Sequence, residues 1–330
     1  MTRPRLGFLG VGWIGRHRMQ ALLEQGVVDV AAIADPSREC RDAAAAIAAG
    51  VTQCEHLGQL LELPLDGIVV ATPSAMHAEH CLSALARGRA VFCQKPLGRT
   101  APETQLVVDA ARAADRLLGV DFSYRYTAAM KKIRELVRGG EVGRVFAIDL
   151  VFHNAYGPDA AWFYEKSSAG GGCVIDLGVH LVDLALWLLD FPRVLGVDSH
   201  LYAGGEPLDR TSDRVEDFAN VQLHLEGGTV VRLACSWRVS AGRDAVIEAQ
   251  VFGSQGGLAM KNVDGSFYDF VGERYRGTQR EQLAAPPDAW GGRAITHWAE
   301  RLADGARFDP EADRFVDVAR VLDTIYGGAV

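Results

Sequence analysis

Three ionisable side chains, Asp176, His180 and Asp183, recur at spacings that suit proton transfer. On an α-helix, offsets of four and seven residues place them within about 60° of one another. The residues between them are nearly all apolar, so we expect a helix that is buried around most of its circumference. Polar groups there must find partners or face a cavity. They are either structurally satisfied, or they form a histidine that is oriented by an adjacent carboxylate and moves a proton.

A lysine at the end of an apolar run is a second candidate for chemistry. Residues 90–93 read as a buried strand, and Gln94, Lys95 and Pro96 follow it directly. Ligands of parallel sheets bind at the carboxyl ends of the strands. Pro96 fixes φ and permits a cis peptide bond, so the backbone there is unusual. Lys95 is either a solvated side chain or a group that stabilises an alkoxide on a substrate.

Three spaced glycines follow the first apolar run and predict a pyrophosphate site. Gly10 permits a tight turn, Gly12 lets backbone N–H groups approach phosphates, and Gly15 lets the following helix pack closely. The N-terminus of that helix then faces the anion. A second strand ends at Asp35, which lies 20 residues after Gly15, where dinucleotide sites place a carboxylate on the adenosine ribose. The alternative is a glycine turn without a ligand in another α/β protein.

The same edge of the predicted sheet supplies further cofactor neighbours. Thr72 follows the apolar strand 67–71, and Arg38 lies close enough to Asp35 to meet a phosphate or stack on adenine. Asp35 favours NAD because it repels a 2′-phosphate, although NADP remains possible. We expect the cofactor to contact Gly10, Gly12, Trp13, Ile14, Gly15, Asp35, Arg38, Thr72, Pro73, Ser74, His77, Gln94 and Lys95.

His77, His80 and Cys81 raise the question of a zinc site, because residues three apart share a helix face. Zinc requires additional ligands, and the sequence nearby offers no second cluster of cysteine and histidine. We therefore interpret this segment as a helix that carries two histidines, and we expect no metal.

Length and composition narrow the class of protein. A chain of 330 residues suits two domains, and 48% hydrophobic with 23% charged residues is typical of a globular protein. We see no apolar run of the roughly 20 residues that span a bilayer. Six cysteines without paired spacing indicate reduced thiols and a cytoplasmic location. A net charge of −8 without a basic block argues against nucleic acid as the main partner.

Apolar strands alternate with helices through residue 121, which predicts an α/β fold with a doubly wound parallel sheet. From Phe122 onward, period-two strands predict a large open sheet that is mostly antiparallel, in an α+β domain. We therefore expect two domains, 1–121 and 122–330. The strands expected in the second domain are 145–152, 194–201, 218–225, 229–237, 246–252 and 257–261, with a closing helix at 309–326.

With these stretches in hand, the chain resembles the Gfo/Idh/MocA family of NAD(P)-dependent oxidoreductases over nearly its whole length. The resemblance lies in the glycine loop, in residues 93–97 at the place of a Glu-Lys-Pro motif, and in residues 176–183, which match an Asp-x-x-x-His motif. It implies an N-terminal Rossmann domain for the cofactor and a C-terminal domain for substrate binding and oligomerisation. It also implies that Lys95, Asp176 and His180 are catalytic. Gln94 departs from the family pattern, because it is the neutral counterpart of the usual glutamate.

The resemblance implies reversible oxidation of a secondary alcohol on a sugar, sugar derivative or cyclitol, as in inositol dehydrogenase. His180 would take the hydroxyl proton with the help of Asp176, and Lys95 would stabilise the oxygen. Polyols need many hydrogen bonds and flat stacking surfaces. Beyond the catalytic groups, the candidate substrate-binding residues are Tyr126, His153, Asn154, Tyr156, Trp162 and Tyr164.

Two other functions remain open at this point. The chain could be a glycosidase or lyase that uses tightly held NAD for transient oxidation, or an NAD-binding sensor or scaffold without catalysis. Gln94 supports the sensor, whereas the presence of Lys95, Asp176 and His180 argues against it. We also expect a homodimer or homotetramer formed through the C-terminal sheet, whose alternating strands such as 229–237 would place apolar side chains on an open face.

Overall fold

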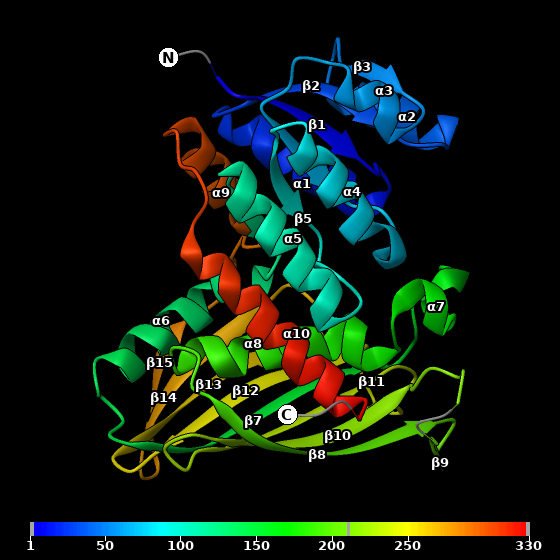
Figure 1. Ribbon diagram of the computed structural model, residues 1–330. Helices are drawn as coiled ribbons and strands as arrows, with labels where there is room; N and C mark the ends of the chain where they lie inside the picture. Colours follow the sequence, from blue (N-terminus) through cyan, green and yellow to red (C-terminus); the bar gives the residue numbers. More distant parts are fainter. Residues whose placement is uncertain (1–2, 210–211, 328–330) are drawn as a thin grey trace. The chain divides into compact units, whose positions relative to one another are not determined.

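The computed structural model describes residues 3–209 and 212–327, which form two compact units (Figure 1). The first unit contains the chain up to Asp121 together with Gly291–Val316. The second contains Phe122–Trp290 and the chain from Asp317 onward. Each unit is built around its own sheet, of six and nine strands respectively.

The first unit is a parallel sheet with helices packed on it. The strand order is β3-β2-β1-β4-β5-β6, so the order reverses between β1 and β4, and the fold expected from the sequence is confirmed. The strands are short and apolar, which suits burial on both faces. They are β1 (Arg5–Leu9), β2 (Asp29–Ala34), β3 (Thr52–Cys54), β4 (Gly67–Val70), β5 (Ala90–Cys93) and β6 (Leu118–Val120). The helices before residue 121 are α1 (Trp13–Gln25), α2 (Arg38–Ile47), α3 (Leu57–Leu61), α4 (His77–Ala86) and α5 (Ala101–Ala114).

Helix α9 (Arg293–Ala303) belongs to the first unit, although the change of pattern after residue 121 predicts a second domain that contains all later residues. The reason is the buried indole of Trp298. Its ring lies 5.7 Å from that of Phe92 on β5, and Cβ atoms at Gly67 and Gly119 would approach it to 2.9 and 2.7 Å. The glycines of β4 and β6 therefore leave the space that this tryptophan fills.

The second unit has the strand order β15-β14-β13-β12-β7-β11-β10-β8-β9. Among the described strands, β7 and β11 are parallel neighbours, and the other neighbouring pairs are antiparallel. The strands are β7 (Val145–Asn154), β8 (Val194–Ala203), β9 (Glu206–Pro207), β10 (Phe218–Leu225), β11 (Val230–Ser236), β12 (Ala245–Gly253), β13 (Gly256–Asn262), β14 (Phe270–Arg276) and β15 (Gln279–Ala284). The main helices are α6 (Ala128–Arg138), α7 (Lys166–Ala169) and α8 (Val179–Leu188), and α10 (Asp313–Ile325) leads into the C-terminal part.

Helices α6 and α8 lie on the same face of this sheet (Figure 1). The open mostly antiparallel sheet is confirmed, but β9, β14 and β15 were not foreseen. Strand β15 is exposed along most of its length and its residues are mainly polar, so it lacks the alternation that marks a half-buried strand.

The uncovered face of the sheet is more polar than expected. Val231 and Leu233 of β11 are buried in the unit, whereas Arg232 between them is exposed and donates to Asp149 of β7 at 2.7 Å. The expectation that β11 places apolar side chains on the open face is met by Val230 and Ala234, which flank Arg232 there, whereas Val231 and Leu233 point into the core. A shallow groove on this face is lined by Asp149, Asp198, His200, Asn220, Gln222 and Arg232, among others.

One helical stretch, Lys166–Leu188, has the length and composition of a membrane span. However, 89% of its most apolar window is buried inside the structure. Core helices of folded proteins have the same composition, and here the stretch contains α7, a π-helical turn and α8.

Candidate active site

The glycine loop has the shape that a pyrophosphate needs. Gly10 has φ of +84°, and a Cβ there would lie 2.5 Å from the carbonyl oxygen of Ala71. A Cβ at Gly15 would lie 2.2 Å from the carbonyl oxygen of Gly10, so both positions require glycine. Gly12 differs, because a Cβ there would meet no described atom within 4 Å. The space beside Gly12, at the start of α1, can therefore receive a phosphate, and the loop fits NAD.

Asp35 is held rigidly at the end of β2. Its Oδ2 accepts the N–H of Val11 at 2.9 Å, and its Oδ1 accepts the N–H of Ser37 at 2.9 Å. Each oxygen keeps a second lone pair for a ribose hydroxyl. Arg38 has a side chain that is 86% exposed and lies 3.6 Å from Asp42, at the surface of the same unit.

His77 and His80 connect the ends of two strands. The ring nitrogens of His77 lie 2.6 Å from the carbonyl oxygen of Pro96 and 2.7 Å from that of Thr72, and His80 Nδ1 lies 3.1 Å from Thr72 Oγ1. Burial lowers the pKa of His77, and its two carbonyl contacts oppose this change. Thr72 follows β4 and Pro96 follows β5, so His77 braces the turn that contains Lys95. In the described part of the chain, no group of three or more His, Cys, Asp or Glu is arranged to hold a metal ion.

Gln94 belongs to a buried hydrogen-bonded cluster at the end of β5. It is buried, and its amide donates to Asp121, which also accepts from Arg18 of α1. The sequence pattern predicts Gln94 as a cofactor neighbour but gives no signal for its partners Asp121 and Arg18. The Lys95–Pro96 peptide bond is cis.

In the second unit, the helix that carries Asp176 is interrupted. Residues Val174–Gly178 form a π-helical turn, and the regular helix α8 starts at Val179. The regular helical spacing assumed from the sequence therefore does not apply between Asp176 and His180. Such π turns occur frequently at functional sites.

The three ionisable residues of this segment have different partners. Asp176 Oδ2 accepts the indole N–H of Trp237 at 3.0 Å, and the ring of His180 lies edge-on to that of Tyr124 at 4.9 Å. Asp183 instead forms a buried ion pair in which Arg125 Nε donates to Oδ2 at 2.8 Å. Burial raises the pKa of Asp183, and the Arg125 guanidinium opposes that change. Asp183 is thus satisfied structurally, which leaves Asp176 and His180 as candidates for chemistry.

The parallel pair β7 and β11 brings further polar groups to the same region of this unit. His153 and Ser236 are register partners at the carboxyl ends of these strands, and His153 Nδ1 lies 2.8 Å from Ser236 Oγ. Trp237, which binds Asp176, is the next residue along the chain. Burial lowers the pKa of His153. Asn154 Oδ1 is buried without a hydrogen-bond partner among the described residues. It is therefore an acceptor whose hydrogen bond is not made within the described chain.

The aromatic candidates divide into two groups. The Tyr164 ring lies 5.4 Å from that of Trp237, and Trp162 stacks at 3.8 Å on Phe163, which in turn contacts Trp237. These rings surround the tryptophan that holds Asp176. The other two candidates have contacts elsewhere. The Tyr126 ring faces Lys131, and the half-exposed Tyr156 lies beside Phe267.

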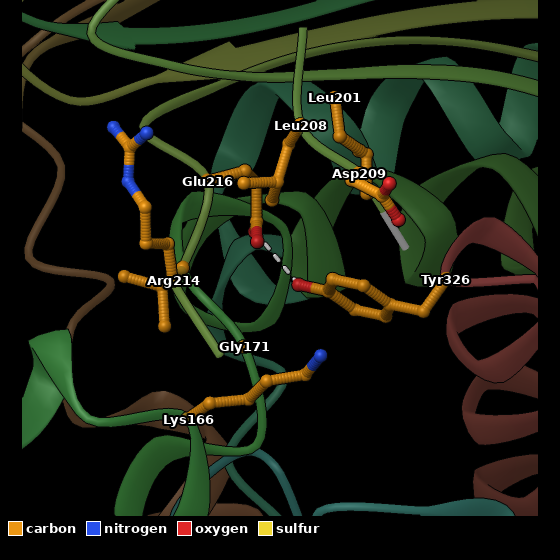
Figure 2. Close-up of a pocket in the computed structure, with 9 residues that line it drawn as sticks. Lys166, Gly171, Leu201, Leu208, Asp209, Arg214, Glu216 and Tyr326 are labelled. Atoms are coloured by element: carbon orange, nitrogen blue, oxygen red, sulfur yellow. Dashed lines mark hydrogen bonds between the residues drawn. The ribbon is translucent and has the colours of Figure 1, made fainter. Parts of the chain in front are cut away.

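Glu216 fixes the start of the π-helical turn through hydrogen bonds to its backbone. Its Oε1 accepts the N–H groups of Gly172 and Val174 at 3.0 and 2.9 Å. It also accepts the hydroxyl of Tyr326 at 2.7 Å (Figure 2). A Cβ at Gly172 would lie 1.9 Å from the Glu216 carbonyl oxygen, and one at Gly171 would lie 2.1 Å from the Tyr326 hydroxyl oxygen. The glycine run before the turn is therefore required by this close approach. Burial raises the pKa of Glu216, while its hydrogen bonds oppose that change.

Sequence reasoning missed Trp237, Glu216 and Arg125. Trp237 and Glu216 lie at the borders of strands, where a large or charged residue in an apolar run gives a weak signal. Arg238, which follows Trp237, has φ of +60° and donates to the Tyr164 hydroxyl at 3.1 Å. A left-handed arginine next to Trp237 is the kind of backbone strain that accumulates at functional sites, and nothing in the sequence reveals it.

Comparison with known proteins shows which family this chain resembles. Residues 5–122 match the oxidoreductase family with an NAD-binding Rossmann fold, and residues 130–259 match the GFO/IDH/MocA C-terminal domain. The rhizopine catabolism protein MocA of Rhizobium meliloti is 34% identical over 189 residues. That alignment covers 57% of this chain and 58% of the relative, which is less than two thirds of either.

A longer alignment and a solved structure extend the likeness to the whole chain. The dTDP-3,4-didehydro-2,6-dideoxy-alpha-D-glucose 3-reductase of Saccharopolyspora spinosa is 30% identical over 94% of this chain and 92% of its own length. KijD10, a 3-ketoreductase from Actinomadura kijaniata solved with NADP and TDP-benzene, has the same fold. Its TM-score is 0.84 at 22% identity, over 99% of this chain and 98% of that one. By its two matched domains and its full-length relative, the chain belongs to the Gfo/Idh/MocA family of oxidoreductases.

Proposed function

We propose that this protein transfers a hydride reversibly between NAD and a secondary alcohol or ketone of a sugar, sugar derivative or cyclitol. The observation that carries the proposal is the interrupted helix of the second unit. There Asp176 is fixed by Trp237 on a π-helical turn, and the buried His180 follows on α8. The other unit has the glycine loop that fits NAD.

Each catalytic role follows from what the residue can do with a proton or a charge. NAD, when bound, supplies the carbon that accepts the hydride. As the alcohol loses its hydride, its hydroxyl proton must leave, and we assign His180 as the base that takes it. Asp176 is the carboxylate that compensates the resulting positive charge. Lys95, on the turn braced by His77, is assigned to stabilise the negative charge that develops on the substrate oxygen.

The substrate class follows from the polar and aromatic groups near Asp176. His153, Ser236 and the unpartnered oxygen of Asn154 offer hydrogen bonds at the ends of β7 and β11. Tyr164 and Trp162 supply ring faces beside them, and rings of this kind suit the flat faces of sugars and cyclitols. The named relatives are a rhizopine catabolism protein and a reductase of a dTDP-linked sugar, which supports the same class.

The cofactor is proposed to be NAD rather than NADP. Asp35 is locked by two backbone N–H groups, so its charge cannot move away from a 2′-phosphate. Arg38 is exposed and able to meet such a phosphate, so NADP should be used less well rather than excluded.

A screen of inositols, hexoses, and hexose acids and phosphates with NAD and NADP tests the proposal. We expect NADH formation with at least one polyol and a higher kcat/KM with NAD than with NADP. The Lys95→Met variant should bind NADH but lose turnover. Product formation without net NADH would instead indicate transient oxidation by tightly held NAD. Tight NADH binding without turnover on any member of the panel would indicate a sensor, and either result would overturn the proposal.

A further inference from the structure

The ends of β5 and β6 hold a buried cluster of three polar side chains. Cys93 and Val120 are register partners on these strands, and the N–H of Asp121 donates to the carbonyl of Cys93 at 2.9 Å. The next residues, Gln94 and Asp121, are therefore neighbours. Gln94 Nε2 donates to Asp121 Oδ2 at 2.5 Å, and Arg18 Nε donates to the same oxygen at 2.6 Å. Asp121 is only 1% exposed.

We propose that Asp121 supplies the carboxylate that the family motif carries at position 94. The negative charge at this strand edge is then not lost in this chain but moved from β5 to the neighbouring β6. Asp121 is on this view a positioning residue, which acts through Gln94 on the turn that contains Lys95. The inference deepens the proposed function, but its main test needs no substrate.

The cluster explains why residue 94 is an amide. Asp121 accepts from both Gln94 and Arg18, so one carboxylate faces one guanidinium and one neutral donor. A glutamate at position 94 would place a second carboxylate within about 2.5 Å of Asp121 Oδ2, where the amide nitrogen now lies. Two buried carboxylates at that distance cannot both be ionised beside a single guanidinium, so the pair would take up a proton.

Two titratable groups beside the cluster, His17 and Cys93, do not offset such a second charge. On α1, His17 Nδ1 lies 2.7 Å from Arg18 Nη1, and burial together with the Arg18 charge lowers the pKa of His17. On β5, burial raises the pKa of Cys93 well above its usual value, and Cys81 of α4 raises it further. His17 and Cys93 are thus neutral at physiological pH. Asp121 Oδ1 is buried and has no hydrogen-bond partner in the described part of the chain.

The experiment compares four proteins: the wild type, Gln94→Glu, Asp121→Asn, and the double variant that exchanges the amide and the carboxylate. Thermal unfolding and NADH affinity, the latter measured by fluorescence below the unfolding temperature, are followed from acidic to alkaline pH. Gln94→Glu should resemble the wild type in acid, where the introduced carboxyl group is protonated and donates to Asp121. It should lose stability and about tenfold in NADH affinity as the pH rises and the shared proton is lost.

The double variant is the decisive protein. An amide at 121 would donate to a carboxylate at 94, and Arg18 would again face one negative charge. We therefore expect the double variant to bind NADH about tenfold more tightly than Gln94→Glu at alkaline pH. Its stability and NADH affinity should also no longer depend on pH as those of Gln94→Glu do. If Asp121→Asn does not fold because Arg18 is unpaired, folding of the double variant shows the recovery by itself.

Asp115→Asn is the matched control, because it makes the same change at an exposed ion pair with Arg307 in the same unit. It should leave NADH affinity and its pH dependence unchanged. A double variant that is no better than either single variant, or that fails to fold, would overturn the inference. So would a Gln94→Glu protein whose NADH binding is insensitive to pH. Loss of catalysis with NADH binding as expected here would count against the proposed function alone.

Discussion

His180 and Asp183 are three residues apart on α8, and their surroundings give them different roles. Asp183 is paired with Arg125 inside the second unit, so its charge is already compensated. His180 packs its ring against the ring of Tyr124, a contact that does not fix the charge of the imidazole. A residue that exchanges protons during turnover must change its charge, which the buried ion pair with Arg125 opposes at Asp183.

Replacing His180 by alanine should lower kcat by about 10² to 10⁴-fold, the usual contribution of a positioned acid or base. NADH affinity should change little, because the cofactor loop belongs to the other unit. Steady-state kinetics on the substrate found in the screen, with NADH titration by fluorescence, measures both quantities. His180→Asn keeps a polar side chain of similar size and should be equally slow.

Asp183→Asn serves as the contrasting variant. It leaves the Arg125 guanidinium unpaired in a buried position, which should destabilise the protein by about 3–5 kcal/mol while the folded fraction keeps its kcat. A folded His180→Ala protein with nearly unchanged turnover would eliminate His180 as the base. A large loss of kcat without a loss of stability in Asp183→Asn would show that Asp183 is needed for catalysis and not for structure.

At the scale of elements, the π-helical turn is positioned by a single carboxylate. Glu216 accepts two backbone N–H groups at the start of the turn. It also accepts the hydroxyl of Tyr326, which follows α10 (Figure 2). Glu216→Ala should leave these donors without an acceptor, at a cost of about 1–3 kcal/mol for each buried group. Because the turn carries Asp176, kcat should fall along with the melting temperature. Tyr326→Phe removes one of the three donors and should have a smaller effect on both.

The pH dependence of the melting temperature of Glu216→Gln separates the effect of the Glu216 charge from the effect of its hydrogen bonds. Burial raises the pKa of Glu216 in the folded protein above its unfolded value. A raised carboxyl pKa means that its contribution to stability falls as the pH rises through the unfolded value of about 4.3 toward the folded pKa. Glutamine cannot ionise, so the melting temperature of the variant should improve relative to the wild type over that rise. A difference that is constant with pH would contradict the buried, strained charge that this prediction assumes.

The elements of the first unit were largely predictable because its signals are local. Apolar strands of four or five residues, glycines at fixed spacing and an acidic residue after β2 each follow from short-range rules. The π turn was not predictable, because periodicity analysis assumes 3.6 residues per turn and cannot register an inserted residue. The partners of Asp176 and Asp183, Trp237 and Arg125, come from segments more than fifty residues away. These contacts depend on the tertiary structure and leave no local signal in the sequence.

For the whole molecule, it was harder to predict which segments belong to which unit than to predict the fold of each unit. Helix α9 returns to the first unit because Trp298 fills the space left by Gly67 and Gly119, a fit that no sequence window contains. Asp121 is an intermediate case. Its place directly after a predicted strand was visible in the sequence, and the sheet order puts that strand beside β5, which ends just before Gln94. The geometry of Arg18 was needed to show that the three side chains form one cluster.

The open face of the second unit's sheet leads to a prediction about assembly. On the described strands it combines the Arg232–Asp149 ion pair with two half-buried apolar register partners, Val151 of β7 and Ala234 of β11, which lie two residues along each strand and so on the same face. A polar centre with apolar neighbours is compatible with a self-complementary interface between two copies, in which each residue meets its counterpart across a two-fold axis. We expect a homodimer or homotetramer that uses this face.

Light scattering at micromolar concentration should therefore give a mass of at least two chains. Changing Val151 and Ala234 together to glutamate should shift the protein toward monomer, because four like charges would be buried in each two-fold contact. Leu106 of α5 is 60% exposed in the first unit, and Leu106→Glu should leave the mass unchanged. A monomeric wild type would refute the assembly. An oligomer that tolerates both glutamates would place the interface on another surface, since a two-fold contact through this sheet cannot accommodate them.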